Sequence, residues 1–395
     1  MPRFTPFYSR TSALCASHSW QEWSGFLSAN MYELHHVREY YAIRTAAALI
    51  DISPLYKYHL HGPDALKLLN RVVTRNVSKC AVGQVMYTPW CDERGKVIDD
   101  GTIARLEENL YRLTAADPNL RWFQDNAIGL DVQIDDVTES IAAVALQGPL
   151  SRDILNALSS SPVSGLHYYR LMQTTIAGVS ATISRTGYTG DLGYEIWIAP
   201  ADAERLWDAL METGQPYKLR AAGQLALDMA RIEAGLLLVA VDFVSAKKTL
   251  FEVQKSTPFE LGLGWAVKLD KSNFVGREAL RKEKKRGPAW ATVGLEVHWE
   301  SLEQIYRSFG MPIHLPESAW SIAVPVYADG RQIGKATSGM WSPILKKYVV
   351  LARIEPRYAK PGTPVSMEVT IEAHRKQAAA TVVTLPFFNP ERKRK

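Results

Sequence analysis

Residues 184–197 read SRTGYTGDLGYEIW and place an acid, Glu195, inside an apolar strand directly after three closely spaced glycines. Glycine allows a backbone to come close to a neighbouring group because it has no Cβ atom. Glu195 has no cation beside it in the sequence, and a carboxylate that accepts two parallel hydrogen bonds suits a heterocycle edge with adjacent NH and NH2 groups. Taken alone, however, the stretch favours a hairpin with a buried ion pair.

A second informative stretch, residues 87–101, ends an apolar strand with two adjacent acids, Asp99 and Asp100. Successive side chains of a strand point to opposite faces, so one acid is expected to lie inside the fold and the other to face solvent. A buried carboxylate is hydrogen-bonded or has a raised pKa, and such groups collect at functional sites. On spacing alone, a structural turn is favoured over a catalytic acid.

The composition is that of an ordinary globular protein: 47% of the 395 residues are hydrophobic and 22% are charged. This length predicts two or three domains. Cys15, Cys80 and Cys91 lack the spacing of a zinc or redox pair, which indicates a reducing, cytoplasmic compartment. We expect no signal peptide and no membrane helix. The basic runs at 281–286 and 392–395 are interpreted as a solvated linker and tail, so no nucleic-acid partner is expected.

Several common chemistries have no support in the sequence. It contains no dinucleotide-binding or triphosphate-binding glycine loop, no GxSxG elbow, no HExxH pair and no EF-hand loop. The histidines do not pair at ligand spacing except as the adjacent His35 and His36, whose side chains diverge on a helix. We therefore expect no metal.

The pattern of apolar residues predicts an α+β protein with a β-rich C-terminal part, from about 289 to 386. A hairpin turn is expected at 92–95, and Ser151 is expected to cap a helix. Helices are predicted at 31–48, 63–72 and 201–213. Strands are predicted at 57–60, 109–115, 141–146, 173–176, 180–185, 194–198, 291–297, 322–327, 331–336 and 364–371.

The stretch SRTGYTGDLGYEIW closely resembles a motif of the aminomethyltransferase (glycine cleavage T-protein) family. Further segments resemble that family in its own order over nearly the whole chain: TPFY at 5–8, YAIRTAAALIDIS at 41–53, GKVIDDG at 95–101, LQGP at 146–149, STPFELGLGWAVKLDKSNFVGREAL at 256–280 and TSGMWSPIL at 337–345. The resemblance implies a three-domain, ring-like, folate-binding fold around a central channel. Its C-terminal domain would be a β-barrel or jelly-roll-like domain.

The resemblance also implies domain boundaries, because the first two domains of the family are interleaved in sequence. Residues 1–53 and 140–243 would form the first folate-binding domain. Residues 54–139 and 244–282 would form the second, and residues 283–395 the C-terminal β-rich domain.

The family pattern assigns roles to five residues of this chain. Asp100 matches the acid near the reacting folate nitrogens and is the predicted catalytic residue. Glu195 matches the acid that grips the pterin. Tyr87, Tyr169 and Tyr188 match aromatic residues of the folate pocket. The implied cofactor is tetrahydrofolate, as acceptor or donor of a methyl or methylene group.

Three departures from the family weigh against glycine cleavage itself. Leu227 stands where the family has an arginine before Asp228, Pro54 replaces a histidine after Ser53, and residues 236–245 read LLLVAVDFVS. These changes resemble the branch that demethylates methoxyaromatics, sulfonium compounds or methylamines. Residues 371–381 also look like those of aromatic O-demethylases.

The predicted function is therefore a tetrahydrofolate-dependent methyltransferase or demethylase that takes a one-carbon group from a small O-, S- or N-methylated substrate. One alternative is the glycine cleavage aminomethyltransferase, which would need a lipoyl carrier protein as partner. A second is a non-catalytic folate-binding regulator, although the Lys-Gly-Cys-Tyr-type signature of that branch is absent. A third is the folate module of a flavin amine oxidase. For a displacement at a folate nitrogen, Glu195 would fix the pterin and Asp100 would orient the reacting amine.

Overall fold

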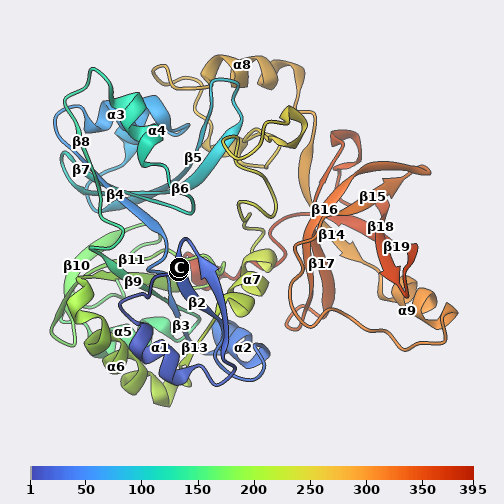
Figure 1. Cartoon of the computed structure of the whole chain (residues 1–395), viewed down its shortest axis with the longest axis horizontal. Coiled ribbons are helices and arrows are strands. Elements are labelled where there is room, and N and C mark those ends of the chain that lie inside the picture. The colour runs from blue at the N-terminus through green and yellow to red at the C-terminus, as the bar shows by residue number, and fades with distance from the viewer. Residues whose placement is uncertain (1) are drawn as a thin grey trace.

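The computed structural model describes residues 2–395, which form two facing sheets and a separate barrel (Figure 1). The first sheet has six strands in the order β10-β11-β12-β9-β3-β13, and only the β13–β3 pair is parallel. Its strands are β3 (Ala48–Asp51), β9 (Ala142–Gln147), β10 (Leu171–Ile176), β11 (Val179–Ser184), β12 (Gly193–Ile198) and β13 (Arg220–Ala221). Every residue of β9 is buried, as its apolar run predicts.

The second sheet lies above the first in Figure 1 and has the order β5-β6-β7-β4-β8. Its strands are β4 (Tyr56–His61), β5 (Gln84–Cys91), β6 (Val97–Glu107), β7 (Leu110–Ala115) and β8 (Gln133–Asp136). The β5–β6 hairpin turns at the predicted residues, with Gly95 at φ +75°, a conformation that glycine adopts without strain. Helices α3 (Ala65–Val72) and α4 (Leu120–Ala127) pack on this sheet.

The C-terminal domain is a closed barrel with the order β14-β17-β16-β15-β18-β19, which confirms the predicted barrel. Its strands are β14 (Ala291–Val297), β15 (Val324–Ala328), β16 (Arg331–Ser342), β17 (Lys347–Ile354), β18 (Pro364–Ile371) and β19 (His374–Val383). Helix α9 (Trp299–Ser308) lies against β19, so this domain is not entirely β. Full closure leaves the barrel without an unpaired sheet edge.

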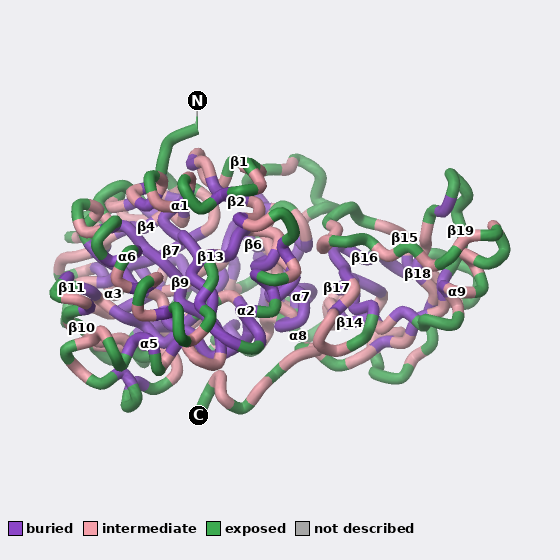
Figure 2. Tube along the Cα trace, turned by 90° about the horizontal axis from the view of Figure 1, so that it is seen from below, coloured by how far each residue is buried: buried purple, intermediate pink, exposed green. Residues whose placement is uncertain are grey.

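The remaining elements surround the first sheet. They are α1 (Tyr8–Leu14), β1 (Ser19–Trp23), β2 (Phe26–Met31), α2 (Val37–Thr45), α5 (Ser151–Leu158), α6 (Ala203–Gly214) and α7 (Gln224–Glu233). The buried residues of α6, which include Leu206, Trp207 and Leu210, recur at helical spacing. Each such side chain contributes about 2 kcal/mol by leaving water. Figure 2 shows buried residues in both sheets, and the second sheet has its own apolar cluster, which includes Leu60, Leu69 and Phe123.

Three local predictions were wrong. The helix expected at 31–48 is only α2, because β2 occupies residues up to Met31. Ser151 lies inside α5 rather than capping it, and its hydroxyl is buried without a partner. The basic run at 281–286 is the second half of α8 (Arg277–Arg286), whose last turn carries Lys284, Lys285 and Arg286 where cations favour the helix dipole.

The C-terminal basic run is also not a free tail, because it returns from the barrel to the first sheet (Figure 2). Arg392 binds Asp191 through two hydrogen bonds of 2.7 and 2.9 Å. Arg185 donates to the carbonyl oxygen of Lys395 at 2.5 Å. The segment therefore attaches the far end of the barrel domain to the loop before β12.

A buried polar cluster, which we call the joint, connects α2 and α7 to the barrel. At its centre the Glu233 carboxylate accepts hydrogen bonds from Tyr40 (2.5 Å), Arg44 Nε (2.8 Å) and Ser342 (2.5 Å). Arg44 also donates to two backbone carbonyls, at 2.8 and 2.9 Å. Since nearly every polar group here has a partner, the joint fixes the barrel against the first sheet.

Within the part of the chain that the structure describes, no helix is long and apolar enough to cross a membrane.

Candidate functional site

The two acids lie near the start of β6, which continues to Glu107, and point to opposite faces of the second sheet. Asp99 is fully buried and accepts hydrogen bonds from the backbone N–H groups of Asp100 (2.8 Å) and Asp117 (3.0 Å) and from the Asn119 amide (2.9 Å). Asp100 is only half-buried and lies on the other face. The structure thus confirms that one acid of the pair lies inside the fold, and it identifies that acid as Asp99.

Asp100 shares its face with Tyr87 of the neighbouring strand. In the β5–β6 register Pro89 pairs with Asp100 and Tyr87 with Thr102, so Tyr87 is the diagonal neighbour of Asp100. Burial raises the pKa of Asp100 to about 6, and the adjacent Tyr87 hydroxyl opposes this shift by stabilising the carboxylate. Both the charged and the neutral form of Asp100 are accessible near neutral pH.

Two further predicted tyrosines lie around Tyr87. Burial raises the pKa of Tyr87 well above its usual range, and the proximity of Asp100, Tyr169 and Tyr188 raises it further. The Tyr188 hydroxyl donates to the carbonyl oxygen of Leu237. On its outer side the Tyr87 ring stacks on Trp265, with centroids 5.8 Å apart. Sequence reasoning did not single out Trp265, which is half-exposed.

Glu195 lies on β12, across from Ser184 on β11 and Ala145 on β9. Its Oε2 atom accepts hydrogen bonds from Thr186 (2.7 Å) and Ser184 (3.5 Å), whereas Oε1 has no partner within residues 2–395. Burial raises the pKa of Glu195, while Thr186, Arg112 and Ser184 oppose that shift. One carboxylate oxygen is therefore held by the protein and the other is free to accept.

The structure brings the five predicted residues into one neighbourhood. Tyr87 is near Asp100, Tyr169 and Tyr188, and Glu195 is near Tyr169, as their mutual effects on pKa indicate. Asp100 comes from the second sheet and Glu195 from the first, so the neighbourhood lies where the two sheets face each other. The functional roles of these residues remain predictions.

Two glycines of residues 184–197 leave space for the side chain of Gln147. A Cβ atom on Gly187 would lie 2.1 Å from the Gln147 amide oxygen, and one on Gly193 would lie 2.3 Å from the Gln147 side chain. The Gln147 amide donates to the Thr186 carbonyl at 3.2 Å and accepts from Thr189 at 2.7 Å. Gln147 therefore holds in place the segment that runs from Thr186 to Glu195.

Arg112 lies in the same neighbourhood, and sequence reasoning did not single it out. It lies on β7 opposite Ala104, on the same face as Asp100, and its guanidinium stacks over the Trp197 ring at 4.1 Å from the centroid. Burial lowers the pKa of Arg112 to about 10, and nearby Glu195 opposes that shift. The available signal was an arginine in the strand Leu110–Ala115, which is otherwise mostly apolar.

The structure also shows where the residues that depart from the family pattern lie. Leu227 on α7 is buried in the same apolar cluster as Trp197, so α7 supplies no cation there. The next residue, Asp228, accepts a 2.6 Å hydrogen bond from Arg231. The Ser53 carbonyl accepts from the buried ammonium group of Lys57 at 2.8 Å, next to Pro54.

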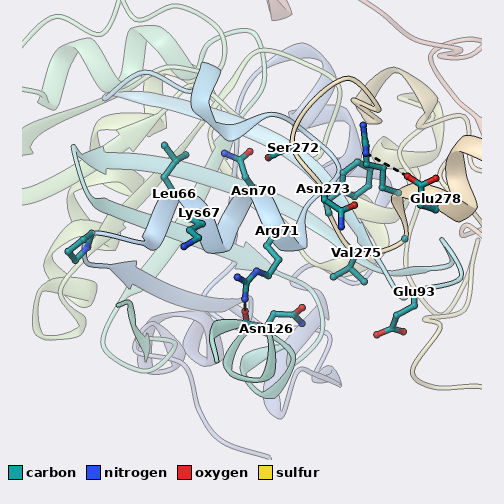
Figure 3. Close-up of a pocket in the computed structure, with 14 residues that line it drawn as sticks. Leu66, Lys67, Asn70, Arg71, Glu93, Asn126, Ser272, Asn273, Val275 and Glu278 are labelled. Carbon is teal, nitrogen blue, oxygen red and sulfur yellow. Dashed lines mark hydrogen bonds and ion pairs between the residues drawn. The ribbon is translucent and has the colours of Figure 1, made fainter. Parts of the chain in front are cut away.

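A separate surface cleft of about 870 Å³ lies between α3 and the loop 272–278 (Figure 3). Its wall includes Leu66, Arg71 and Val275, and Arg71 donates to the Asn126 carbonyl at 2.7 Å. None of the five predicted residues lines this cleft. Its volume suits a ligand, but it lacks the paired acids and the stacked aromatic rings of the neighbourhood between the sheets.

The chain matches known proteins over nearly its full length. Residues 7–271 match the GCVT N-terminal domain, and residues 317–389 match the glycine cleavage T-protein C-terminal barrel domain. An aminomethyltransferase of Halalkalibacterium halodurans is 35% identical over 355 residues, which cover 89% of this chain and 89% of the relative. The crystal structure of glycine cleavage system aminomethyltransferase T from Bartonella henselae has a TM-score of 0.83 at 24% identity, with 98% of this chain and 99% of that chain covered, a likeness of fold.

Another relative is the trimethylamine-oxide aldolase of Ruegeria pomeroyi, which is 34% identical over 408 residues. That match covers 100% of this chain but only 48% of the relative, so this chain spans about half of that enzyme.

Fold and matches together define the class of protein as a one-carbon transferase enzyme. Within that class, the chain belongs to the aminomethyltransferase (glycine cleavage T-protein) family, whose aminomethyltransferases use tetrahydrofolate. The resemblance inferred from the sequence motifs is confirmed, and so are the mixed α and β architecture and the C-terminal barrel.

Proposed function

We propose that this enzyme transfers a one-carbon group from a small O-, S- or N-methylated substrate to tetrahydrofolate. The observation that carries the proposal is the pairing of Glu195, with a free carboxylate oxygen, and Asp100, with a pKa near 6, in one neighbourhood between two sheets. The first can hold a ring edge that offers two N–H donors, and the second can exchange a proton near neutral pH.

Binding of the pterin is assigned to Glu195 and the tyrosines. Thr186 and Ser184 fix the orientation of the Glu195 carboxylate, so that it can receive the adjacent NH and NH2 groups of the ring. The Tyr87 ring, already stacked on Trp265, offers an aromatic surface for the folate. The tyrosine hydroxyls stay neutral, because burial raises the pKa of Tyr87, Tyr169 and Tyr188.

Asp100 is assigned to the reacting nitrogen. Tetrahydrofolate, when bound, would supply the nucleophilic nitrogen. The transferred carbon would gain a bond to that nitrogen as its bond to the donor heteroatom breaks, and the heteroatom would leave with the bonding electrons, taking up a proton where it would otherwise be an anion. The Asp100 carboxylate orients the amine, stabilises its developing positive charge and accepts its proton. Partial burial strengthens that electrostatic contribution, since the charge is less screened by water than at the surface.

Of the three classes of donor, N-methylated amines have the most direct support. The relative from Ruegeria pomeroyi, named for trimethylamine oxide, matches this chain from end to end. Methylated amines and their N-oxides are therefore the first compounds to test.

Glycine cleavage aminomethyl transfer is the second candidate, because relatives named aminomethyltransferase align over about nine-tenths of their length. It would need an aminomethyl-loaded lipoyl carrier protein as partner. Leu227 argues against it, since an apolar side chain stands where the family resemblance implies an arginine.

The test is incubation of the full chain with tetrahydrofolate and a panel of methylated amines, amine N-oxides, methoxybenzoates and sulfonium compounds, with an aminomethyl-loaded carrier protein in parallel. Mass spectrometry would detect methyl- or methylene-tetrahydrofolate. We expect product from at least one small donor and none from the carrier. Product from the carrier alone would establish the second candidate, and folate binding without any turnover would indicate a regulator.

A further inference from the structure

Arg112 is a buried cation that the protein leaves without a hydrogen-bond partner. Only 4% of its surface is exposed, its Nε atom is buried without an acceptor, and no acceptor within residues 2–395 receives a hydrogen bond from its guanidinium. A guanidinium offers five N–H donors, and an unpaired buried donor costs about 1–3 kcal/mol or more. By contrast, the buried Arg44 has three partners in the joint.

The position of this cation is nevertheless well defined. Its guanidinium lies 4.1 Å from the centroid of the Trp197 ring, so a cation–π contact fixes its plane. Trp197 follows Glu195 by two positions on β12 and lies on the same face of that strand. Residues two apart on a strand are separated by about 7 Å, so the guanidinium is held beside the Glu195 carboxylate.

The two opposite charges do not neutralise each other directly. Within the described chain, Arg112 and Glu195 form no ion pair, although each shifts the pKa of the other toward its charged form. Glu195 instead uses Oε2 for Thr186 and keeps Oε1 free. An acceptor and a donor therefore stand side by side, and both lack a protein partner.

We propose that Arg112 donates hydrogen bonds to the 4-oxo oxygen of the pterin, next to the two N–H groups that Glu195 accepts. The edge of a 2-amino-4-oxopteridine presents the 2-amino group, the N3–H and the 4-oxo oxygen in sequence. That order of donor, donor and acceptor complements the two carboxylate oxygens of Glu195, of which Oε1 is free and Oε2 has one close donor in Thr186, followed by the free guanidinium of Arg112. This inference rests on the proposed function, because it assumes that Glu195 holds a pterin.

Arg112 is then a specificity-determining residue. In a 4-amino-pteridine an amino group replaces the 4-oxo oxygen, and N3 carries no hydrogen. Its N–H donors would therefore face the Arg112 guanidinium, and the N3 lone pair would face the Glu195 carboxylate. The enzyme should select 4-oxo over 4-amino pterins, and the part of this selection that arises at position 4 should depend on Arg112.

The experiment measures the dissociation constants of tetrahydrofolate and of its 4-amino-4-deoxy counterpart, anaerobically, by isothermal titration calorimetry on the full chain. The variants are Arg112→Met, Arg112→Lys and Arg121→Met, the last being a control at an exposed arginine of α4, with 85% of its side chain accessible. We expect the unchanged protein to prefer the 4-oxo ligand by roughly 100-fold or more. Arg112→Met should reduce this preference by about tenfold or more, with the remainder arising from the N3 position that faces Glu195, whereas Arg112→Lys should give an intermediate value and Arg121→Met should have no effect.

A structural role of Arg112 predicts a different result. If Arg112 served stability, Arg112→Met would lower the melting temperature, whereas removal of an unpaired buried cation should leave it unchanged or raise it. A preference that is as large in Arg112→Met as in the unchanged protein, or a lowered melting temperature that Arg112→Lys restores without restoring the preference, would overturn the inference. A raised KM for the methylated donor with an unchanged preference would also overturn it, since Arg112 would then contact the donor.

These outcomes are distinct from a failure of the proposed function. If the unchanged protein bound neither pterin, both the proposed function and this inference would be wrong. Binding of both pterins with equal affinity by the unchanged protein would overturn the inference alone.

Discussion

The joint and the neighbourhood of Asp100 and Glu195 contain the same kinds of buried charged side chains, but the protein satisfies them to very different degrees. In the joint, Glu233 has three donors and Arg44 has three acceptors. Between the sheets, one oxygen of Glu195 and the guanidinium of Arg112 have no hydrogen-bond partner among residues 2–395. Complete satisfaction stabilises a fold, while incomplete satisfaction leaves hydrogen bonds for a ligand.

The largest effect is expected from Asp100→Asn, which keeps the shape of the side chain but removes its ability to accept a proton. Turnover should fall by about a hundred- to ten-thousand-fold, while the affinity for tetrahydrofolate changes by less than about threefold. Single-turnover kinetics and calorimetry would separate the two quantities, with Asp125→Asn on the surface of α4 as a control. Equal losses of turnover and affinity, or no loss of either, would show that the role assigned to Asp100 is wrong.

The opposite behaviour is expected in the joint. Glu233→Gln removes the nearer of the two carboxylates that face the buried Arg44, leaving Asp191 at 3.6 Å, and should lower the free energy of unfolding by about 3 kcal/mol. Urea denaturation would measure this loss, and calorimetry should still show tetrahydrofolate binding to the folded fraction. An unchanged unfolding midpoint in urea would show that the joint does not stabilise the fold more than the neighbourhood of Asp100 and Glu195 does.

The variant Glu195→Gln tests the same comparison by removing a carboxylate that we expect to bind the ligand. The amide offers only one acceptor oxygen and no charge, so the affinity for tetrahydrofolate should fall by about 10- to 100-fold, which corresponds to the loss of a charge-assisted hydrogen bond. Turnover at saturating folate should change less than it does in Asp100→Asn. A variant with full affinity would exclude Glu195 as the group that holds the pterin.

A smaller effect concerns the pH dependence of stability. Because burial raises the pKa of Asp100 to about 6 in the folded protein, the folded state binds a proton there more tightly than the unfolded chain does. The stability contributed by that proton is present at acidic pH and is lost as the pH rises through about 6. Asp100→Asn has no such loss, so its free energy of unfolding relative to the unchanged protein should rise by about 1–3 kcal/mol between pH 4 and pH 7.5. Urea titrations of both proteins at the two pH values would measure this change. If the difference in free energy of unfolding between the two proteins were the same at both pH values, the prediction would be wrong.

Much of the fold could be predicted from the sequence, because its signals are local. The apolar run of β9, the turn at Gly95 and the alternation around Asp99 and Asp100 all depend on near neighbours in the chain. The same holds for the motif around Glu195, which identified the family before any contact was known.

What could not be predicted depends on partners that are distant in sequence. Arg112 reads as an ordinary charged residue until β12 places Trp197 and Glu195 against it. Arg392 reads as part of a solvated tail until Asp191 is seen to bind it. The domain boundaries implied by the family resemblance stay a prediction, since they divide the chain by long-range pairing rather than by local pattern.

The arrangement of the first sheet has a consequence for synthesis of the chain on the ribosome. β3 ends at Asp51, but its antiparallel partner β9 begins only at Ala142, after all five strands of the second sheet. At ~5–20 residues per second, the ribosome needs about ten seconds to make the intervening segment. During that interval Leu49 and Ile50, both buried in the finished protein, stay uncovered while the second sheet can already fold. The nascent strand around these two residues is therefore where a molecular chaperone would be needed first.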